Sequence, residues 1–170
     1  KNNYYNTLFS INFSNISYFD KQILVPFGEF LPLRNFLSFM IPITGPSDYS
    51  EGNNSRLIDI NDNLSFIPVI CYEIIYYWKL FNIINFKGNF ILNITNDIWF
   101  GKYLGPYQHF YFSKLRAAEF NKPLIRVSNN GITSIINSNG KIIEISKLNE
   151  ISNLNYNLKI SKFKSYYNIH

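Results

Sequence analysis

The chain has a single cysteine, and this scarcity excludes several classes of protein. One thiol cannot build an internal disulfide framework, nor can it supply the several thiolates of a structural zinc or iron–sulfur site. Long apolar runs are lacking too, because the most apolar stretch, residues 30–43, is interrupted by two prolines, an arginine and an asparagine. A spanning helix needs ~20 apolar residues. We therefore expect neither a metal site nor a membrane span within this segment.

A basic run is also missing, although the net charge is +5 from 16 Lys and Arg against 11 Asp and Glu. The cations are spread along the chain, without the aromatic-interleaved cluster that binds single strands. Nucleic acid is therefore not an expected partner. The first residues lack a methionine and the charged-then-apolar pattern of a signal peptide. We expect the chain to be an internal piece of a longer gene product.

Short apolar runs alternate with helix-length segments, a pattern that predicts one α/β domain. A segment rich in Gly, Ser, Asp and Asn, residues 45–63, predicts a long loop. Expected strands are residues 8–13, 65–70, 89–94, 124–127, 132–136, 141–146 and 155–160, and expected helices are residues 32–40, 74–86 and 106–120. Residues 137–140 predict a hairpin turn between two of these strands.

Cys71 stands where the predicted strand 65–70 passes into a predicted helix. A sharp turn there exposes the sulfur, and the amides at a helix N-terminus favour a thiolate. The backbone N–H of Tyr72 is then placed to donate to an oxyanion that forms at Cys71. The alternative is that Cys71 is a small buried apolar residue, as lone cysteines usually are.

Four sequence blocks around Cys71 favour the nucleophile. They are Tyr18-Phe19-Asp20-Lys21 with Leu24-Val25-Pro26-Phe27-Gly28-Glu29-Phe30, then Ile70-Cys71-Tyr72-Glu73, Thr95-Asn96-Asp97-Ile98-Trp99-Phe100-Gly101, and Gly105-Pro106-Tyr107-Gln108-His109-Phe110. In type and order they resemble the lysine segment, the nucleophile motif and the following loop and helix of the nitrilase superfamily. Within that superfamily they resemble the apolipoprotein N-acyltransferases. The resemblance extends over residues 18–141.

The resemblance implies a catalytic role for three residues. Cys71 would be the nucleophile, Lys21 would stabilise the oxyanion beside the amide of Tyr72, and Glu29 would be a second active-site carboxylate. Lysine supplies a positive charge where negative charge develops, and a nearby carboxylate keeps that lysine charged and positioned. The alternative for Lys21 and Glu29 is an exposed ion pair worth ~0–1 kcal/mol.

The resemblance also places Tyr72, Glu73, Asn96 and Trp99 in an oxyanion and substrate pocket. Tyr72 and Trp99 are equally compatible with packing, and Glu73 with a first-turn carboxylate favoured by the helix dipole. His109 raises the alternative of a cysteine–histidine dyad, in which the histidine would activate the thiol. We favour packing for it, because the family uses glutamate as its base.

The family's triad begins with a glutamate upstream of the lysine segment, and this chain has no such block. The resemblance therefore implies a partial carbon–nitrogen hydrolase domain over residues 1–170. Its nitrilase-like αββα sandwich would be incomplete on the N-terminal side and would lack the flanking transmembrane helices. We expect the chain alone to be inactive for want of this glutamate.

The implied enzyme is an acyltransferase that needs no cofactor. Cys71 would take an acyl chain from a phospholipid as a thioester and pass it to the α-amino group of a diacylglyceryl-cysteine apolipoprotein. The implied location is the periplasmic face of a bacterial inner membrane, reached through parts outside this chain. Two alternatives remain open, a soluble nitrilase-type amidohydrolase and a non-catalytic remnant.

Overall fold

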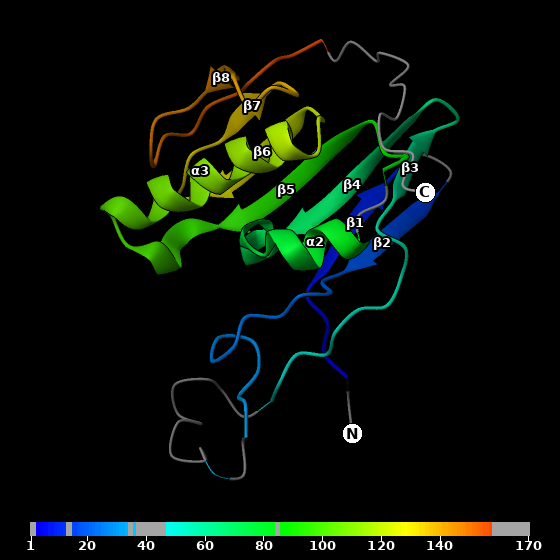
Figure 1. The fold of residues 1–170 in the computed structure, drawn as a ribbon, viewed down its shortest axis with the longest axis vertical. Coiled ribbons are helices and arrows are strands. Elements are labelled where there is room, and N and C mark those ends of the chain that lie inside the picture. The colour runs from blue at the N-terminus through cyan, green and yellow to red at the C-terminus, as the bar shows by residue number, and fades with distance from the viewer. Residues whose placement is uncertain (1–2, 13–14, 34–35, 37–46, 84–85, 158–170) are drawn as a thin grey trace. The chain divides into compact units, whose positions relative to one another are not determined.

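The computed structural model describes residues 3–12, 15–33, 36, 47–83 and 86–157. The chain divides into two compact units, Lys1–Ser55 and Arg56–His170. The first unit contains a hairpin of β1, Thr7–Ile11, and β2, Ile16–Asp20, which pair in antiparallel register (Figure 1). Lys21 follows β2 directly, so the hairpin determines where the lysine segment begins.

The second unit is built on a six-stranded sheet of order β3-β4-β5-β6-β7-β8. Its strands are Ile58–Asn61, Leu64–Ile70, Phe90–Asn96, Leu124–Asn129, Ser134–Ile136 and Ile142–Ile145. The three central strands, β4, β5 and β6, are parallel, and the flanking pairs are antiparallel. The parallel strands are apolar because both faces of such a strand are usually covered. Their carboxyl ends meet at one edge of the sheet.

Two helical connections join the parallel strands. The 3-10 helix η2, Cys71–Ile75, and helix α2, Tyr77–Ile83, follow β4, whereas η3, Asp97–Phe100, and α3, Leu104–Glu119, follow β5. Both crossovers run in the same direction along the sheet, and right-handed crossovers then put both helices on one face. Figure 1 shows α2 and α3 on the same side of the strands.

The core of the second unit consists of large apolar side chains from every layer. Its fully buried members, all 0% exposed, are Ile67, Ile74, Leu80, Ile91, Leu124 and Ile136. Burying one such side chain contributes roughly 1.5–3 kcal/mol. This packing holds the carboxyl ends of β4 and β5 in place.

Most predicted strands and helices are confirmed, but β2 was not expected from the sequence, and three other expectations need correction. The predicted loop 45–63 contains β3, Ile58–Asn61, because these residues alternate apolar and polar before a tight turn into β4. The helix expected over residues 74–86 begins only at Tyr77, after the 3-10 turn. Residues 155–157 form no strand.

Parts of several expected elements lie outside the described residues. They are most of the helix over residues 32–40, residues 158–160 of the predicted strand 155–160, and residues 13, 45–46 and 84–85 of the expected strand, loop and helix there. Among the residues that the structure does describe, no helix is both long and apolar enough to cross a membrane.

The packing predicts unequal effects of truncating two isoleucines on β5. Ile91→Ala removes a side chain that is 0% exposed and should lower the free energy of unfolding by about 2–5 kcal/mol. Ile94→Ala on the same strand, 40% exposed, is the matched control and should cost under about 1 kcal/mol. Urea unfolding measures both. Equal losses would contradict this view of the core.

Candidate functional site

Cys71 lies at a strained turn between β4 and η2. Its φ of 52° is in the left-handed region, which a residue with a side chain adopts only at a cost. The residue is partly exposed. The strand-to-helix turn predicted from the sequence is therefore confirmed, with a 3-10 helix as its first helical segment.

Glu73 holds this turn from the buried side. Its carboxylate is 0% exposed and accepts a hydrogen bond of 2.7 Å from the backbone N–H of Ile70. Arg56 donates to the same carboxylate at 2.8 and 3.0 Å and also to the carbonyl of Pro68 at 2.8 Å. The Glu73 side chain therefore points into the protein, beneath the turn.

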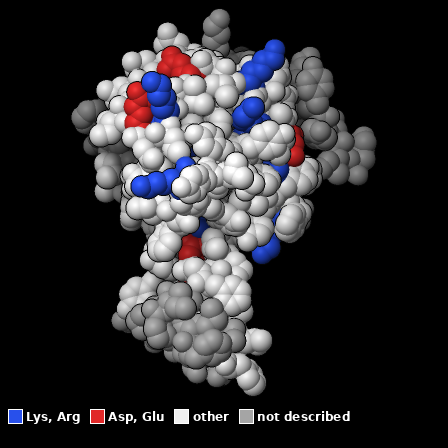
Figure 2. All heavy atoms as spheres, turned by 90° about the vertical axis from the view of Figure 1, so that its left-hand side faces the viewer, with Lys and Arg blue, Asp and Glu red and all other residues white. Residues whose placement is uncertain are grey.

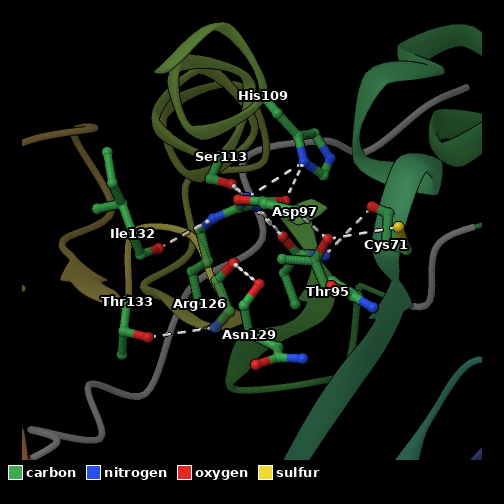
Figure 3. A network of polar contacts seen from close by, with 12 residues as sticks. Cys71, Thr95, Asp97, His109, Ser113, Arg126, Asn129, Ile132 and Thr133 are labelled. Atoms are coloured by element: carbon green, nitrogen blue, oxygen red, sulfur yellow. Dashed lines mark hydrogen bonds and ion pairs between the residues drawn. The ribbon is translucent and has the colours of Figure 1, made fainter. Parts of the chain in front are cut away.

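The sulfur of Cys71 lies beside β5. The hydroxyl of Thr95 lies 3.4 Å from the sulfur and 3.1 Å from Oδ1 of Asp97 (Figure 3). The side-chain amide of Asn93 donates to the carbonyl of Val69 at 3.0 Å and, at 3.5 Å, to that of Cys71. Two polar residues of β5 thus contact the turn of its neighbour.

Behind Thr95 lies a buried ionic cluster of Asp97, Arg126 and His109. Arg126 on β6 donates to Oδ2 of Asp97 at 2.6 Å, and Nδ1 of His109 lies 2.8 Å from Oδ1. Asp97 and Arg126 are 0% exposed and His109 is 1% exposed. Figure 3 shows these side chains converging from η3, β6 and α3.

Arg126 uses its remaining donors within the same layer. Its guanidinium donates to the side chains of Asn93 at 2.7 Å and Ser113 at 3.2 Å, and to the carbonyl of Ile132 at 3.2 Å. A Cβ at Gly131 would collide with the Asp97 carboxylate, which explains the need for glycine there. The cluster therefore joins β5, β6, α3 and the loop before β7.

The cluster lowers the pKa values of both Asp97 and His109, which favours a charged carboxylate and a neutral imidazole. Burial acts to raise the pKa of Asp97, but the hydrogen bond from His109 and the charge of Arg126 outweigh it and lower the pKa to about 2. Burial lowers the pKa of His109 against the opposing effect of Asp97. An ionised Asp97 can only accept, so the shared hydrogen lies on Nδ1 of a neutral His109.

Aromatic rings form a wall next to the turn. The ring of Tyr72 stacks on Phe100 with 5.7 Å between centroids, and both rings contact the imidazole of His109, at 5.8 and 4.8 Å. Trp99 is 85% exposed, so it is no loop anchor. The side chain of Asn96 accepts from the backbone N–H of Ile98 at 3.2 Å and thereby caps η3.

Lys21 and Glu29, in the first unit, form a direct ion pair of 2.6 Å. The lysine is 1% exposed and the carboxylate 13%, so the alternative of an exposed surface pair is wrong. Glu29 also accepts from the backbone N–H of Val25 at 2.8 Å and from the side chain of Asn6 at 3.0 Å. These contacts fix the carboxylate, and the carboxylate fixes the lysine.

The structure thus brings Lys21 to Glu29 in one unit and Tyr72 and Glu73 to Cys71 in the other. Convergence of Lys21 on the sulfur stays a prediction. His109 packs against rings, as favoured from the sequence, and also bonds to Asp97, whereas Arg116 forms an ion pair with Glu119 at 3.0 Å. The described residues contain no group of three or more His, Cys, Asp or Glu that could hold a metal ion.

Sequence reasoning missed the contribution of Thr95, Arg126 and Arg56. A usable signal existed for Arg126, because a charged residue within the apolar run 124–127 must find a buried partner. Thr95 offered no signal, since threonine is an ordinary strand residue. Arg56 lies in the segment predicted as a loop.

A parallel α/β layer that carries a lone cysteine on a left-handed turn after a central strand defines the class of this protein. The carbon-nitrogen hydrolase family matches residues 2–157, and the chain belongs to this family. The predicted resemblance to the nitrilase superfamily is confirmed by this match.

Curated apolipoprotein N-acyltransferases are similar to the chain. The protein of Rickettsia typhi is 41% identical over 150 residues, which cover 87% of this chain and 30% of the relative. The protein of Wigglesworthia glossinidia brevipalpis is 40% identical over 155 residues, which cover 84% of this chain and 30% of the relative. The protein of Brucella suis is 39% identical over 147 residues, which cover 82% of this chain and 27% of the relative. The chain spans less than a third of the length of these relatives.

Solved structures share the fold at low identity. A CN-hydrolase superfamily protein from Xanthomonas campestris has a TM-score of 0.59 at 14% identity, with 84% of this chain and 52% of the other covered. Nit3 of Saccharomyces cerevisiae, a nitrilase superfamily member, has a TM-score of 0.53 at 16% identity, with coverages of 84% and 49%. The predicted nitrilase-like α/β fold class is confirmed.

The low pKa of Asp97 predicts how stability depends on pH. A carboxyl whose pKa falls from 3.8 to about 2 on folding stabilises the fold above pH 3.8, and this contribution is lost as the pH falls toward 2. It amounts to roughly 2 kcal/mol. Asp97→Asn should remove that acid-dependent loss and, by leaving Arg126 without an anion, lower stability at pH 7 by about 3–5 kcal/mol.

Urea unfolding at a series of pH values measures both effects. Asp59→Asn, at an exposed position on β3, is the matched control and should leave the profile almost unchanged. An acid limb of the same size in Asp97→Asn and the unchanged protein would exclude Asp97 as its source.

Proposed function

We propose that the chain is the nucleophile-bearing part of an acyltransferase that acts on lipoproteins. The observation that carries the proposal is the partly exposed Cys71 on its strained turn, in a chain similar to proteins named apolipoprotein N-acyltransferase. The acyl donor would be a phospholipid and the acceptor a diacylglyceryl apolipoprotein. The domain would face the periplasm at a bacterial inner membrane.

The reaction would proceed in two transfers through a thioester. The Cys71 thiol gives up its proton, and the thiolate attacks the ester carbonyl of the phospholipid to form the S–C bond. The ester C–O bond then breaks, and the lysophospholipid takes up that proton and leaves as an alcohol. The α-amino group of the apolipoprotein then attacks the thioester. An amide forms, the amine loses a proton, and the thiolate is released.

Lys21 and the amide of Tyr72 would stabilise the oxyanion in both transfers. The burial of Lys21 and its pairing with Glu29 support this role, because a fixed charge needs no reorganisation during the reaction. Glu29 would hold Lys21 in position. Removing one such donor typically costs ~3–4 kcal/mol of transition-state stabilisation.

The substrate pocket would be formed by Tyr72, Asn96 and Trp99, with Glu73 positioning the turn from below. The segment after β5 supports contact with an apolar substrate, because it exposes a set of large apolar side chains: Ile98, Trp99, Tyr103, Leu104 and Tyr107. In Figure 2, much of the face shown carries no charged side chain. An exposed set of large apolar side chains suits acyl chains more than a polar ligand.

The test uses the full-length gene product in detergent with a fluorescent phospholipid and a diacylglyceryl lipopeptide. Cys71→Ser and Lys21→Ala should each lower acyl transfer by at least about two orders of magnitude without unfolding the protein. Lys79→Ala, at an exposed position on α2, is the matched control. Near-normal turnover in Lys21→Ala would remove the lysine from the mechanism.

The same assay separates the second candidate function, amide or ester hydrolysis. The match to the carbon-nitrogen hydrolase family supports hydrolysis as the second candidate, because a nucleophilic cysteine can also pass its acyl group to water. Free fatty acid with no N-acylated lipopeptide would support the hydrolase. N-acylated lipopeptide with little free acid supports the transferase.

Trp99 provides a further prediction about the pocket. Trp99→Ala should lower kcat/KM for the phospholipid about tenfold, since the exposed ring would contact the acyl chain. Trp78→Ala on α2, where the ring is 62% exposed, is the matched control and should change kcat/KM less than about twofold. Steady-state kinetics with both variants decide the matter, and equal effects would argue against Trp99 as a substrate contact.

A further inference from the structure

Thr95 is placed where it touches both the reacting sulfur and a buried anion. Its hydroxyl lies 3.4 Å from Sγ of Cys71 and 3.1 Å from Oδ1 of Asp97, and the residue is 5% exposed. Threonine is β-branched, so its χ1 angle is restricted and the oxygen stays near both partners. The roles proposed for Cys71, Lys21 and Glu29 do not involve this contact.

A hydroxyl carries one hydrogen and cannot donate to both partners at once. Asp97 is ionised and only accepts. While the sulfur is a thiol, its S–H can donate to the Thr95 oxygen and the Thr95 hydrogen can donate to Asp97. Once the sulfur is a thiolate, it becomes a charged acceptor beside the same hydroxyl. Rotation about the C–O bond then redirects the hydrogen to sulfur, while His109 and Arg126 still satisfy Asp97.

We propose that the Thr95 hydroxyl is a hydrogen-bond donor to the Cys71 thiolate, which it reaches by rotating away from Asp97. Asp97 is a positioning residue in this arrangement, because it holds the hydroxyl when the sulfur is protonated. The inference rests on the proposed role of Cys71 as a nucleophile and adds a contact to the reacting atom (Figure 3).

The same contacts would also allow an alternative mechanism, in which the thiol proton moves through Thr95 to Asp97. An ordinary thiol has a pKa of about 8.5, whereas the pKa of Asp97 is about 2. The transfer would be unfavourable by roughly six orders of magnitude. Asp97 therefore cannot serve as the base, and donation from Thr95 to the thiolate remains.

Other charged or titratable groups lie around the same turn within the second unit. They are Glu73 of η2 with its partner Arg56, Asp97 of η3, His109 of α3 and Arg126 of β6. A substitution confined to the Thr95 hydroxyl leaves all of them in place. A change in the titration of Cys71 can then be assigned to the lost donor.

The experiment measures alkylation of Cys71 by iodoacetamide in the full chain, followed by intact mass. The chain has one cysteine, so the rate reports on this sulfur alone. Thr95→Val removes the hydroxyl at nearly constant volume, and Thr95→Ser keeps it. The assay contains no acyl substrate, so its outcome is independent of whether the protein transfers acyl groups.

For Thr95→Val we expect about a tenfold lower alkylation rate at pH 7, with the midpoint of the pH profile about one unit higher. The plateau at high pH should change less than about twofold. Thr95→Ser should restore the original profile. If Thr95→Val fails to fold by near-ultraviolet circular dichroism, Thr95→Ala is measured in the same way.

Three results would overturn the proposal. One is a Thr95→Val profile that overlays the original, because no donor is then lost. Another is a rate that falls equally at all pH values including the plateau, which indicates altered access to the sulfur. The third is an equal shift of the midpoint in Thr95→Val and Thr95→Ser, because Thr95→Ser keeps the hydroxyl and the shift then does not depend on it.

Discussion

Arg126 on β6 carries a positive charge into the interior of the second unit, where its side chain has no exposure to solvent. Removing an ion from water costs several kcal/mol, so the charge is tolerable only with a buried anion and filled hydrogen bonds. Asp97 supplies the anion at 2.6 Å, and Asn93, Ser113 and a backbone carbonyl accept the remaining hydrogens. The positions of four elements behind the cysteine depend on this one pair.

The consequence for the candidate site is rigidity at the atoms next to the sulfur. The carboxylate of Asp97 is held by two donors, so the oxygen that faces Thr95 has a fixed position. A second buried pair, Arg56 with Glu73, holds the other side of the turn through the N–H of Ile70. The left-handed conformation of Cys71 persists because both sides of the turn are tied to buried charges.

A third buried pair, Lys21 with Glu29, has the same construction in the first unit. In each pair a carboxylate that is anchored by other hydrogen bonds positions a cation in or beside a structural turn. Buried pairs of this kind are weak contributors to net stability compared with apolar substitutes, but losing one partner is costly. They are better explained by the precision that they give to a site than by the stability that they add.

The sequence by itself determined the order of the elements from β4 onward, the placement of Cys71 at the end of a central strand, and the family, but it did not predict β2 or β3. Apolar periodicity and the motif blocks are local, and they needed no knowledge of distant contacts. The local pattern gave a wrong prediction at β3, because the Asn and Asp residues there are typical of loops although the strand alternates apolar and polar residues. It also could not decide whether Glu73 is a pocket residue or a first-turn carboxylate favoured by the helix dipole, because both have the same local pattern.

Only the tertiary structure decided which polar residues meet. Thr95, Asp97, His109 and Arg126 come from β5, η3, α3 and β6, and parallel pairing of the strands brings them to one edge. Burial likewise turned the Lys21–Glu29 pair from a possible surface contact into an enclosed one. The physical reason is that the strength of a polar contact depends on desolvation and on partners far away in the chain. A local sequence pattern predicts neither the desolvation nor the partners.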